Sequence, residues 1–218
     1  MEQELAVTTQ ALSKAFGRVV AVDGLDLQVP RGGVFGLLGP GGAGKSTILR
    51  LLAGRLRATG GSATVAGVEV AFDRADLRRR IGVLDQRPGL YDWMTGWELL
   101  AFAADLAGVG RAELKARVDQ TLERVGLGDV AGERIGGYSG QMRRRVGIGQ
   151  ALAGEPEVLL LDDPLGSLDP AARDELVTLL RELGTQATVV MTTDQPADAK
   201  AACDLVAVLE GGRLVTAP

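Results

Sequence analysis

A run of glycines followed by a lysine and two hydroxyl residues has the composition and spacing of a phosphate-binding site. The run comprises Gly39, Pro40, Gly41, Gly42, Ala43, Gly44, Lys45, Ser46 and Thr47, in the pattern G-x-x-x-x-G-K-S. Glycines let backbone N–H groups curl around a polyphosphate, the lysine reaches the outer phosphates, and the serine hydroxyl binds Mg²⁺. An apolar run at 34–38 precedes it, and helix-forming residues at 48–52 follow. This strand-to-helix context predicts a phosphate-binding loop, or P-loop, in preference to an ordinary glycine-rich turn.

Two consecutive acids are a second chemical feature. Asp162 and Asp163 follow the apolar run at 158–161 and precede Pro164. The run is typical of a buried strand, and open α/β sheets bind ligands beyond the carboxyl ends of their strands. A carboxylate at that place suits a Mg²⁺ ion shared with nucleotide phosphates. Two acids solvated in a turn are the alternative, and the P-loop in the same chain favours the metal-binding interpretation.

The composition limits the possible functions. The 218 residues are 46% hydrophobic and 24% charged, with a formal net charge of −4, which is typical of a globular domain and disfavours a broad basic face for nucleic acid. Cys203 is the only cysteine, so the sequence provides neither a disulfide framework nor a thiolate metal cluster. No histidine is present, which excludes imidazole from the chemistry of this chain. We expect no signal peptide and no membrane span, because no apolar run approaches roughly 18 residues.

The hydrophobic pattern predicts an α/β fold. Alternating residues at 5–9 and 25–29 and a hairpin at 62–70 predict a small antiparallel β subdomain, while short apolar runs at 34–38, 81–86, 158–161, 188–191 and 205–209 predict strands of a core sheet. Helical spacing over 95–125, 171–183 and 197–202 separates several of these runs. Strands that alternate with helices predict a mostly parallel sheet. We expect one domain over 1–218, a P-loop nucleotide-hydrolase core with a helical subdomain inserted at about 87–155.

The segment that begins at Tyr138 predicts the start of another helix. Ser139 has the type and position of an N-cap, and three arginines follow at 143–145. The arginines would form either a patch for a phosphate backbone, or a solvated face or set of salt bridges. On a helix they point in different directions, which favours salt bridges in an acidic protein.

The ordered set of motifs resembles the ATP-binding cassette (ABC) ATPases that drive membrane transporters. The motifs are the P-loop, Gln86, Tyr138-Ser139-Gly140, Asp162-Asp163-Pro164 and Ser167-Leu168-Asp169, and the resemblance covers essentially the whole chain. The segments Gln86-Arg87-Pro88-Gly89-Leu90-Tyr91 and Met142-Arg143-Arg144-Arg145 look most like the separate-chain ATPases of drug and small-molecule exporters.

The resemblance implies roles for individual residues toward ATP and Mg²⁺. Lys45, Ser46 and Thr47 would hold the phosphates and the metal. Gln86 would bind the metal and sense the attacking water, and Asp162 would orient the metal. Phe16 stands where the family stacks an aromatic ring on adenine, with an ordinary core phenylalanine as the alternative.

The resemblance also implies partners. Each ATP would lie between the P-loop of one subunit and the signature segment (Ser139, Gly140 and Gln141) of another, in a homo- or heterodimer, with Asp169 communicating across it. Tyr91, Trp93 and Met94 lie where the family docks a transmembrane permease, or else they pack locally in the helical subdomain. The chain would then be cytoplasmic and peripheral on the inner face of the cell membrane, with no nucleic acid bound.

Three residues depart from the family pattern. Asp163 replaces a glutamate that acts as general base, and its shorter side chain withdraws the carboxylate from the water. Asp194 replaces a histidine that contacts the γ-phosphate. It would repel the phosphate, and it could at the same time N-cap the next helix. Both changes fall on residues assigned to catalysis.

The third departure is Gln141, which replaces the second glycine of the signature segment. A non-glycine residue forced to positive φ costs about 1–2 kcal/mol. Gln141 would therefore weaken the ATP sandwich, or its amide would donate a substitute hydrogen bond.

These features lead to an ATP-binding and slowly ATP-hydrolysing subunit that powers or gates an ABC exporter. The alternative from another class is a regulatory subunit that clamps ATP with little or no hydrolysis, paired with another ATPase chain. A soluble relative acting on DNA or ribosomes is a third hypothesis, and the negative net charge disfavours it.

Overall fold

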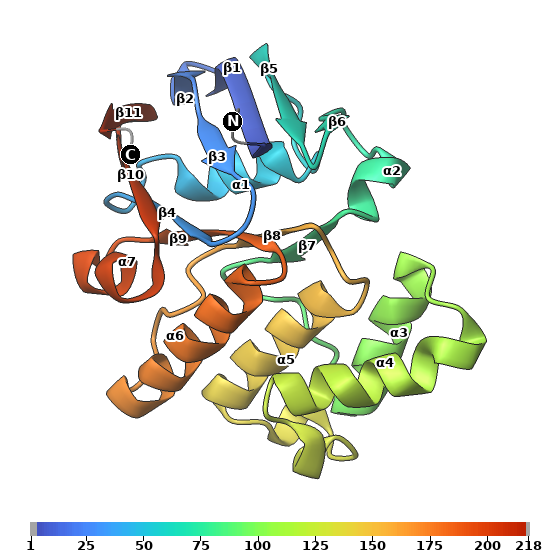
Figure 1. The fold of residues 1–218 in the computed structure, drawn as a ribbon. Helices are drawn as coiled ribbons and strands as arrows, with labels where there is room; N and C mark the ends of the chain where they lie inside the picture. The colour runs from blue at the N-terminus through green and yellow to red at the C-terminus, as the bar shows by residue number, and fades with distance from the viewer. Residues whose placement is uncertain (1–3, 217–218) are drawn as a thin grey trace.

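The computed structural model describes residues 4–216, which form two sheets and a group of helices. Figure 1 shows the antiparallel sheet at the top, the parallel sheet across the middle and most helices below it. Among the described residues no helix combines the length and apolarity that crossing a bilayer requires.

The parallel sheet has the strand order β11-β10-β4-β9-β8-β7. Its strands are β4 (Val34–Leu38), β7 (Ile81–Leu84), β8 (Val158–Leu161), β9 (Thr188–Thr193), β10 (Leu205–Glu210) and β11 (Arg213–Thr216). All neighbours pair in parallel except β11, which runs antiparallel to β10 at the edge. The prediction of a mostly parallel core sheet is confirmed, and β11 is a strand that the sequence pattern did not reveal.

The antiparallel sheet contains β1, β2, β3, β5 and β6, so the predicted antiparallel subdomain is present, although the sequence pattern did not reveal β2 or the second half of β1. Their bounds are β1 (Leu5–Phe16), β2 (Val19–Leu25), β3 (Gln28–Pro30), β5 (Gly60–Val65) and β6 (Val68–Glu69). The strand expected at 25–29 is interrupted, because the Thr9 hydroxyl donates to Leu25 O at 2.6 Å and accepts from Leu27 N at 2.8 Å. The Thr9 side chain thus bonds to both sides of the break, in addition to the backbone bond from Thr9 N to Leu27 O at 2.9 Å.

The helices lie on both faces of the parallel sheet. They are α1 (Lys45–Leu52), α2 (Ala75–Arg78), α3 (Gly96–Ala107), α4 (Arg111–Arg124), α5 (Gly140–Leu152), α6 (Pro170–Gly184) and α7 (Pro196–Ala202), with 3₁₀ turns at Gly128–Val130 and Ile135–Gly137. The helical spacing over 95–125 belongs to two helices, because Gly108 caps α3 in the left-handed region at φ 92°. These helices and α5 fill the region where the helical subdomain is expected.

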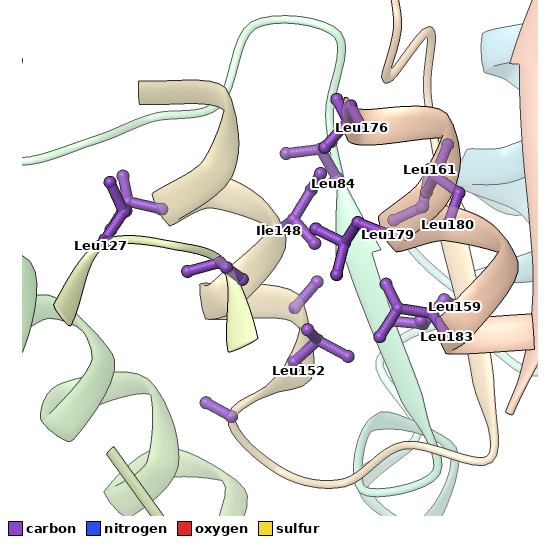
Figure 2. Packing of buried hydrophobic residues seen from close by; sticks show 14 of the residues in the cluster. Leu84, Leu127, Ile148, Leu152, Leu159, Leu161, Leu176, Leu179, Leu180 and Leu183 are labelled. Carbon is purple, nitrogen blue, oxygen red and sulfur yellow. The ribbon is translucent and has the colours of Figure 1, made fainter. Parts of the chain in front are cut away.

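Two hydrophobic cores form on the two faces of the parallel sheet. In β8, Leu159 and Leu161 face the core that includes α3 to α6, whereas Val158 and Leu160 face the core around α1. Figure 2 shows Ile148 and Leu152 of α5 directed toward leucines of α6 and the sheet. Because successive side chains of β8 point to opposite faces, helices pack on both faces of the sheet, whose strand ends carry the chemical motifs.

Replacing a core leucine of α3 tests this packing. Leu100 is fully buried, so Leu100→Ala should lower the free energy of unfolding by about 2–5 kcal/mol. Leu106 on the same helix is 71% exposed, so Leu106→Ala should change the free energy of unfolding by less than about 0.5 kcal/mol. Urea denaturation of the two variants checks the difference, and equal losses would contradict the assignment of the two helix faces.

Candidate active site

The P-loop lies between β4 and α1, with its backbone close to three other strands, β2, β9 and β10. A Cβ atom on Gly44, which has φ 96°, would collide with the carbonyl oxygen of Ala21, and one on Gly39 would collide with that of Leu209. Gly39 N also donates to Thr193 O at 3.2 Å. Glycine is required at both positions because no side chain fits between these backbones. This packing orients the loop and the N-terminus of α1.

Lys45 folds back over the loop. Its ammonium donates to Gly39 O at 2.6 Å and to Pro40 O at 2.9 Å. The charge therefore lies at the mouth of the loop, close to the first N–H groups of α1, which have no acceptor within the helix. Lysine and helix terminus together make this place attractive to an anion.

One cleft of about 260 Å³ joins the P-loop to the other predicted chemical residues. Its lining consists of Ala21, Gly41, Gly42, Ala43, Gly44, Lys45, Ser46, Thr47, Gln86, Asp162, Asp163, Thr192 and Asp194. These residues come from β2, from the segment that follows β4, and from the ends of β7, β8 and β9, which are neighbours in the parallel sheet. The carboxyl ends of parallel strands meet at one edge, which brings together residues far apart in the sequence.

The two acids after β8 have different environments. Asp162 is only 5% exposed and accepts a hydrogen bond from the Thr192 hydroxyl at 2.7 Å. Asp163 is partly exposed, and its carboxylate accepts from the Gln86 amide at 3.4 Å. A buried, fixed carboxylate therefore lies beside a more accessible one.

Asp163 also has an uncommon backbone. Its φ of 51° is in the left-handed region, where a non-glycine residue is strained by about 1–2 kcal/mol. A Cβ on Gly166 would collide with the Asp163 carboxylate. Sequence reasoning did not identify Gly166, although a glycine three residues after the acid pair was the signal.

Arg144 of α5 reaches the rear of this site, which sequence reasoning also missed. Its guanidinium donates to Gln86 O at 3.1 Å. Burial lowers the pKa of Arg144, and the negative charges of Asp163 and Asp162 partly oppose that shift. The arginine thus links the helix of the signature segment to the Gln86 backbone.

The other two arginines of this run have their own partners. Arg143 pairs with Asp92 at 2.7 Å, and Arg145 pairs with Glu175 at 2.6 Å. Two of the three arginines thus form salt bridges, as that interpretation predicts, whereas Arg144 bonds to a backbone carbonyl.

Asp194 lines the cleft, but the prediction that it N-caps the following helix is wrong. The N-cap of α7 is Gln195, which makes no capping bond with its side chain. The hydroxyl of Thr193 accepts from Gln195 N at 3.0 Å, while Asp194 accepts from the Gln195 amide at 3.0 Å. Asp194 is exposed and directed to the same cleft as Lys45.

The signature segment does not line the cleft of its own chain. Ser139 N-caps α5, as predicted, and accepts from Met142 N at 3.2 Å. Ser139 and Gly140 are exposed.

Gln141 has ordinary helical backbone, so the strain expected from positive φ does not arise. Its amide donates to Glu175 at 3.2 Å, on the carboxylate oxygen that Arg145 also binds.

The remaining predicted residues lie outside the lining of this cleft. Phe16 is 50% exposed at the end of β1, with the Lys14 ammonium 5.0 Å from its ring centre, so it is not a core phenylalanine. Asp169 N-caps α6, accepting from Ala172 N at 3.0 Å. Tyr91 and Trp93 are exposed, whereas Met94 packs partly buried against the helical core.

A magnesium ion fits this donor set only together with a phosphate ligand. Among residues 4–216, no group of three or more acidic or cysteine side chains is arranged to hold a metal by itself. The cleft instead offers the Ser46 hydroxyl, the Gln86 amide and the Asp162 carboxylate. Mg²⁺ is commonly held by one or two protein groups plus substrate phosphates and waters, so this set suits it.

Comparison with known proteins agrees with the site. The model of a family described as ABC transporter matches residues 22–166. The chain is 39% identical over 208 residues to the uncharacterized ABC transporter ATP-binding protein YxlF of Bacillus subtilis, covering 95% of this chain and 69% of that protein. It is 40% identical over 211 residues to the daunorubicin/doxorubicin resistance ATP-binding protein DrrA of Streptomyces peucetius, covering 96% of this chain and 64% of DrrA. The chain thus spans about two thirds of the length of these relatives.

A solved structure shows the same fold. The structure of cbiO1 from Clostridium perfringens, described as part of the ABC transporter complex cbiONQ, matches with a TM-score of 0.89 at 27% identity, covering 98% of this chain and 88% of that one. A family match over most of the chain and relatives near 40% identity lead to one conclusion. The chain belongs to the ABC transporter family of ATP-binding proteins.

Proposed function

We propose that this chain is an ATP-binding and slowly ATP-hydrolysing subunit that powers or gates a membrane exporter. The observation that carries the proposal is the single cleft that joins the P-loop to Gln86, Asp162 and Asp163. Family membership implies ATP and Mg²⁺ as cofactors. The direction of transport is supported by DrrA, which is named for resistance to two drugs.

The P-loop would bind the triphosphate of ATP. Lys45 already lies at the mouth of the loop on two carbonyl oxygens. A phosphate offers the ammonium a stronger, charged acceptor, and the N-terminus of α1 adds further N–H donors. Phe16, exposed at the end of the hairpin that also contributes Ala21 to the cleft, would stack on adenine.

Ser46, Gln86 and Asp162 would hold Mg²⁺. When bound, the ion neutralises phosphate charge in the transition state. Asp162 suits this role because it is buried and held by Thr192, so its carboxylate is oriented before the ligand arrives.

Asp163 would orient the water that attacks the γ-phosphate in line. Gln86 contacts this carboxylate, and Gly166 leaves room for it. The side chain is one methylene shorter than the glutamate of the family pattern, and a base must lie within about 2.6–3.2 Å of its target. Such a displacement reduces the rate by about 10². Asp194 adds a negative charge where the family has a histidine donor, so we propose slow turnover.

The exposed signature segment would complete the site of a second ATPase subunit. Ser139, Gly140 and Gln141 lie outside the cleft of their own chain, so their contact with ATP requires another chain. We propose a homo- or heterodimer that closes on ATP, with Asp169 near the contact and residues 87–155 moving as the helical subdomain.

A groove between the core and the helical subdomain would receive a transmembrane permease. The groove has a volume of about 890 Å³ and includes Arg55, Phe72, Pro88 and Leu106 in its lining. Next to it, Tyr91 contacts Trp93 in a tilted arrangement and Phe102 edge to face, with ring centres 5.8 and 6.5 Å apart. Exposed aromatic and aliphatic side chains beside a groove are typical of a protein interface. The chain would then lie at the inner face of the membrane.

One contact favours the alternative of a regulatory subunit that clamps ATP with little hydrolysis. The Gln141 amide is held by Glu175 within its own chain. That bond uses one of the two amide N–H groups and fixes the orientation in which the other could reach ATP on a second subunit.

Lys45→Ala tests nucleotide binding. Loss of charged hydrogen bonds costs about 1.5–3 kcal/mol, so the Kd for ATP should rise about 10- to 150-fold. Lys115→Ala on α4 is the control and should leave the Kd for ATP unchanged. Isothermal titration checks both, and an unchanged Kd for Lys45→Ala would contradict the assignment of the P-loop.

A combined Asp163→Glu and Asp194→His variant tests the cause of slow turnover. Restoring the reach of the base and a γ-phosphate donor should raise kcat by about 10² or more. Phosphate release under saturating MgATP measures it. No gain would reject the weakened-pump proposal and favour the clamping subunit or a block at Gln141.

Trp93→Ser combined with Phe102→Ser tests the permease interface. Loss of these apolar contacts should reduce co-purification of membrane subunits at least about tenfold, since buried aromatic anchors contribute most to binding. Val215→Ser, which changes an equally exposed side chain on β11, is the control. Equal recovery of membrane partners by all three proteins would argue against this surface.

A further inference from the structure

Thr192, at the end of β9, is the residue that connects the two acids. Its side chain is fully buried. The hydroxyl donates to Asp162 Oδ1 at 2.7 Å and accepts from Asp163 N at 2.9 Å. We propose that Thr192 is a positioning residue that orients the metal-binding carboxylate of Asp162 and fixes the backbone from which Asp163 extends. The inference rests on the proposed function and adds a residue to that site.

The hydroxyl can make both contacts at once because it carries one proton and two lone pairs. The hydroxyl donates its proton to Asp162 Oδ1. The other carboxylate oxygen, Oδ2, takes no part in this bond, and Asp162 lines the cleft. Groups that hydrogen-bond to metal ligands orient them and tune their affinity for the metal. Thr192 would do this for Mg²⁺ without contacting the ion.

The second contact supports a strained backbone. Asp163 has φ 51°, and its N–H and C=O groups bond to Thr192 Oγ1 at 2.9 Å and to Gly166 N at 3.2 Å. A left-handed conformation at a non-glycine residue persists only where neighbouring groups enforce it. The Thr192 hydroxyl provides one of these two restraints, so it also sets where the Asp163 carboxylate can reach.

The position of Thr192 in the sheet links the acids to the P-loop. Thr192 is paired with Leu37 of β4, and the next residue, Thr193, accepts from Gly39 N through its carbonyl at 3.2 Å. The end of β9 therefore contacts the P-loop with its backbone and the acids with a side chain. A small shift of the P-loop or of the two acids relative to β9 would therefore change the distance between bound phosphates and the ligands of the metal.

Packing alone does not require the hydroxyl. Val190, two residues earlier on the same face of β9, is also fully buried in the core around α1. Valine has nearly the shape of threonine, so Thr192→Val removes the two hydrogen bonds with little change in volume. Thr192→Ser keeps the hydroxyl and removes a methyl group.

Thr193 supplies a matched control. It is a buried threonine on the same strand, but its hydroxyl accepts from Gln195 N and interacts with the buried Asp198 instead of with Asp162 or Asp163. Thr193→Val should therefore affect folding to a similar degree without affecting the response to Mg²⁺.

The test measures the affinity of a fluorescent ATP analogue for each variant, once with Mg²⁺ and once with EDTA. For Thr192→Val we expect the gain in affinity due to Mg²⁺ to fall by about 10- to 100-fold, and the affinity in EDTA to stay within about twofold. Thr192→Ser and Thr193→Val should resemble the wild type. In an Asp162→Asn background, Thr192→Val should have no further effect on the Mg²⁺ response, since its action passes through Asp162.

Three results would overturn the inference. One is an unchanged Mg²⁺ response in Thr192→Val, another is an equal loss with and without Mg²⁺, and the third is failure of Thr192→Ser to retain the response. If Thr192→Val does not fold, as judged by its thermal midpoint, Thr192→Ala removes the same hydroxyl and is measured in its place. A wild-type chain that fails to bind the analogue under either condition would refute the proposed function itself.

Discussion

Electrostatic repulsion is the constraint on which this site depends. Asp162, Asp163 and Asp194 line the same cleft as the P-loop, so a triphosphate bound there would lie beside three carboxylates. Like charges a few ångströms apart repel strongly where water is excluded. The positive groups have to be close by, and they are Lys45 at the loop, the N-terminus of α1, and Arg144 behind the acids. Binding with Mg²⁺ follows from the same constraint, because the ion offsets the charge that remains.

Much of this arrangement was predictable from the sequence. The P-loop, the buried strand before Asp162, and the alternation of strands and helices each carry a local pattern that physical chemistry explains. The sheet also brings Gln86, Asp162 and Asp194 to the P-loop, because all of them follow parallel strands. For such residues, the parallel strand that each one follows is nearly sufficient to predict its place in the site.

Other features depend on contacts that no local pattern encodes. In the sequence, nothing distinguishes Thr192 from other hydroxyl residues at strand ends. Its contacts become evident only in the fold, which brings Asp162 and Asp163 beside it. The break between β2 and β3 arises from the side chain of Thr9, which is distant in the sequence. The helical backbone of Gln141 removes the strain expected from comparison with glycine, and its bond to Glu175 on α6 follows from tertiary packing of two helices.

The cleft between the P-loop and the end of β8 is the place where we propose that the metal-bound triphosphate binds. A crystal structure of the chain with a non-hydrolysable ATP analogue and Mn²⁺, whose anomalous scattering locates the metal, tests it most directly. We expect Mn²⁺ beside Ser46 and Asp162, with the Lys45 ammonium moved from Gly39 O and Pro40 O onto the phosphates. A nucleotide bound elsewhere, or Lys45 still on those carbonyl oxygens beside a bound triphosphate, would contradict it.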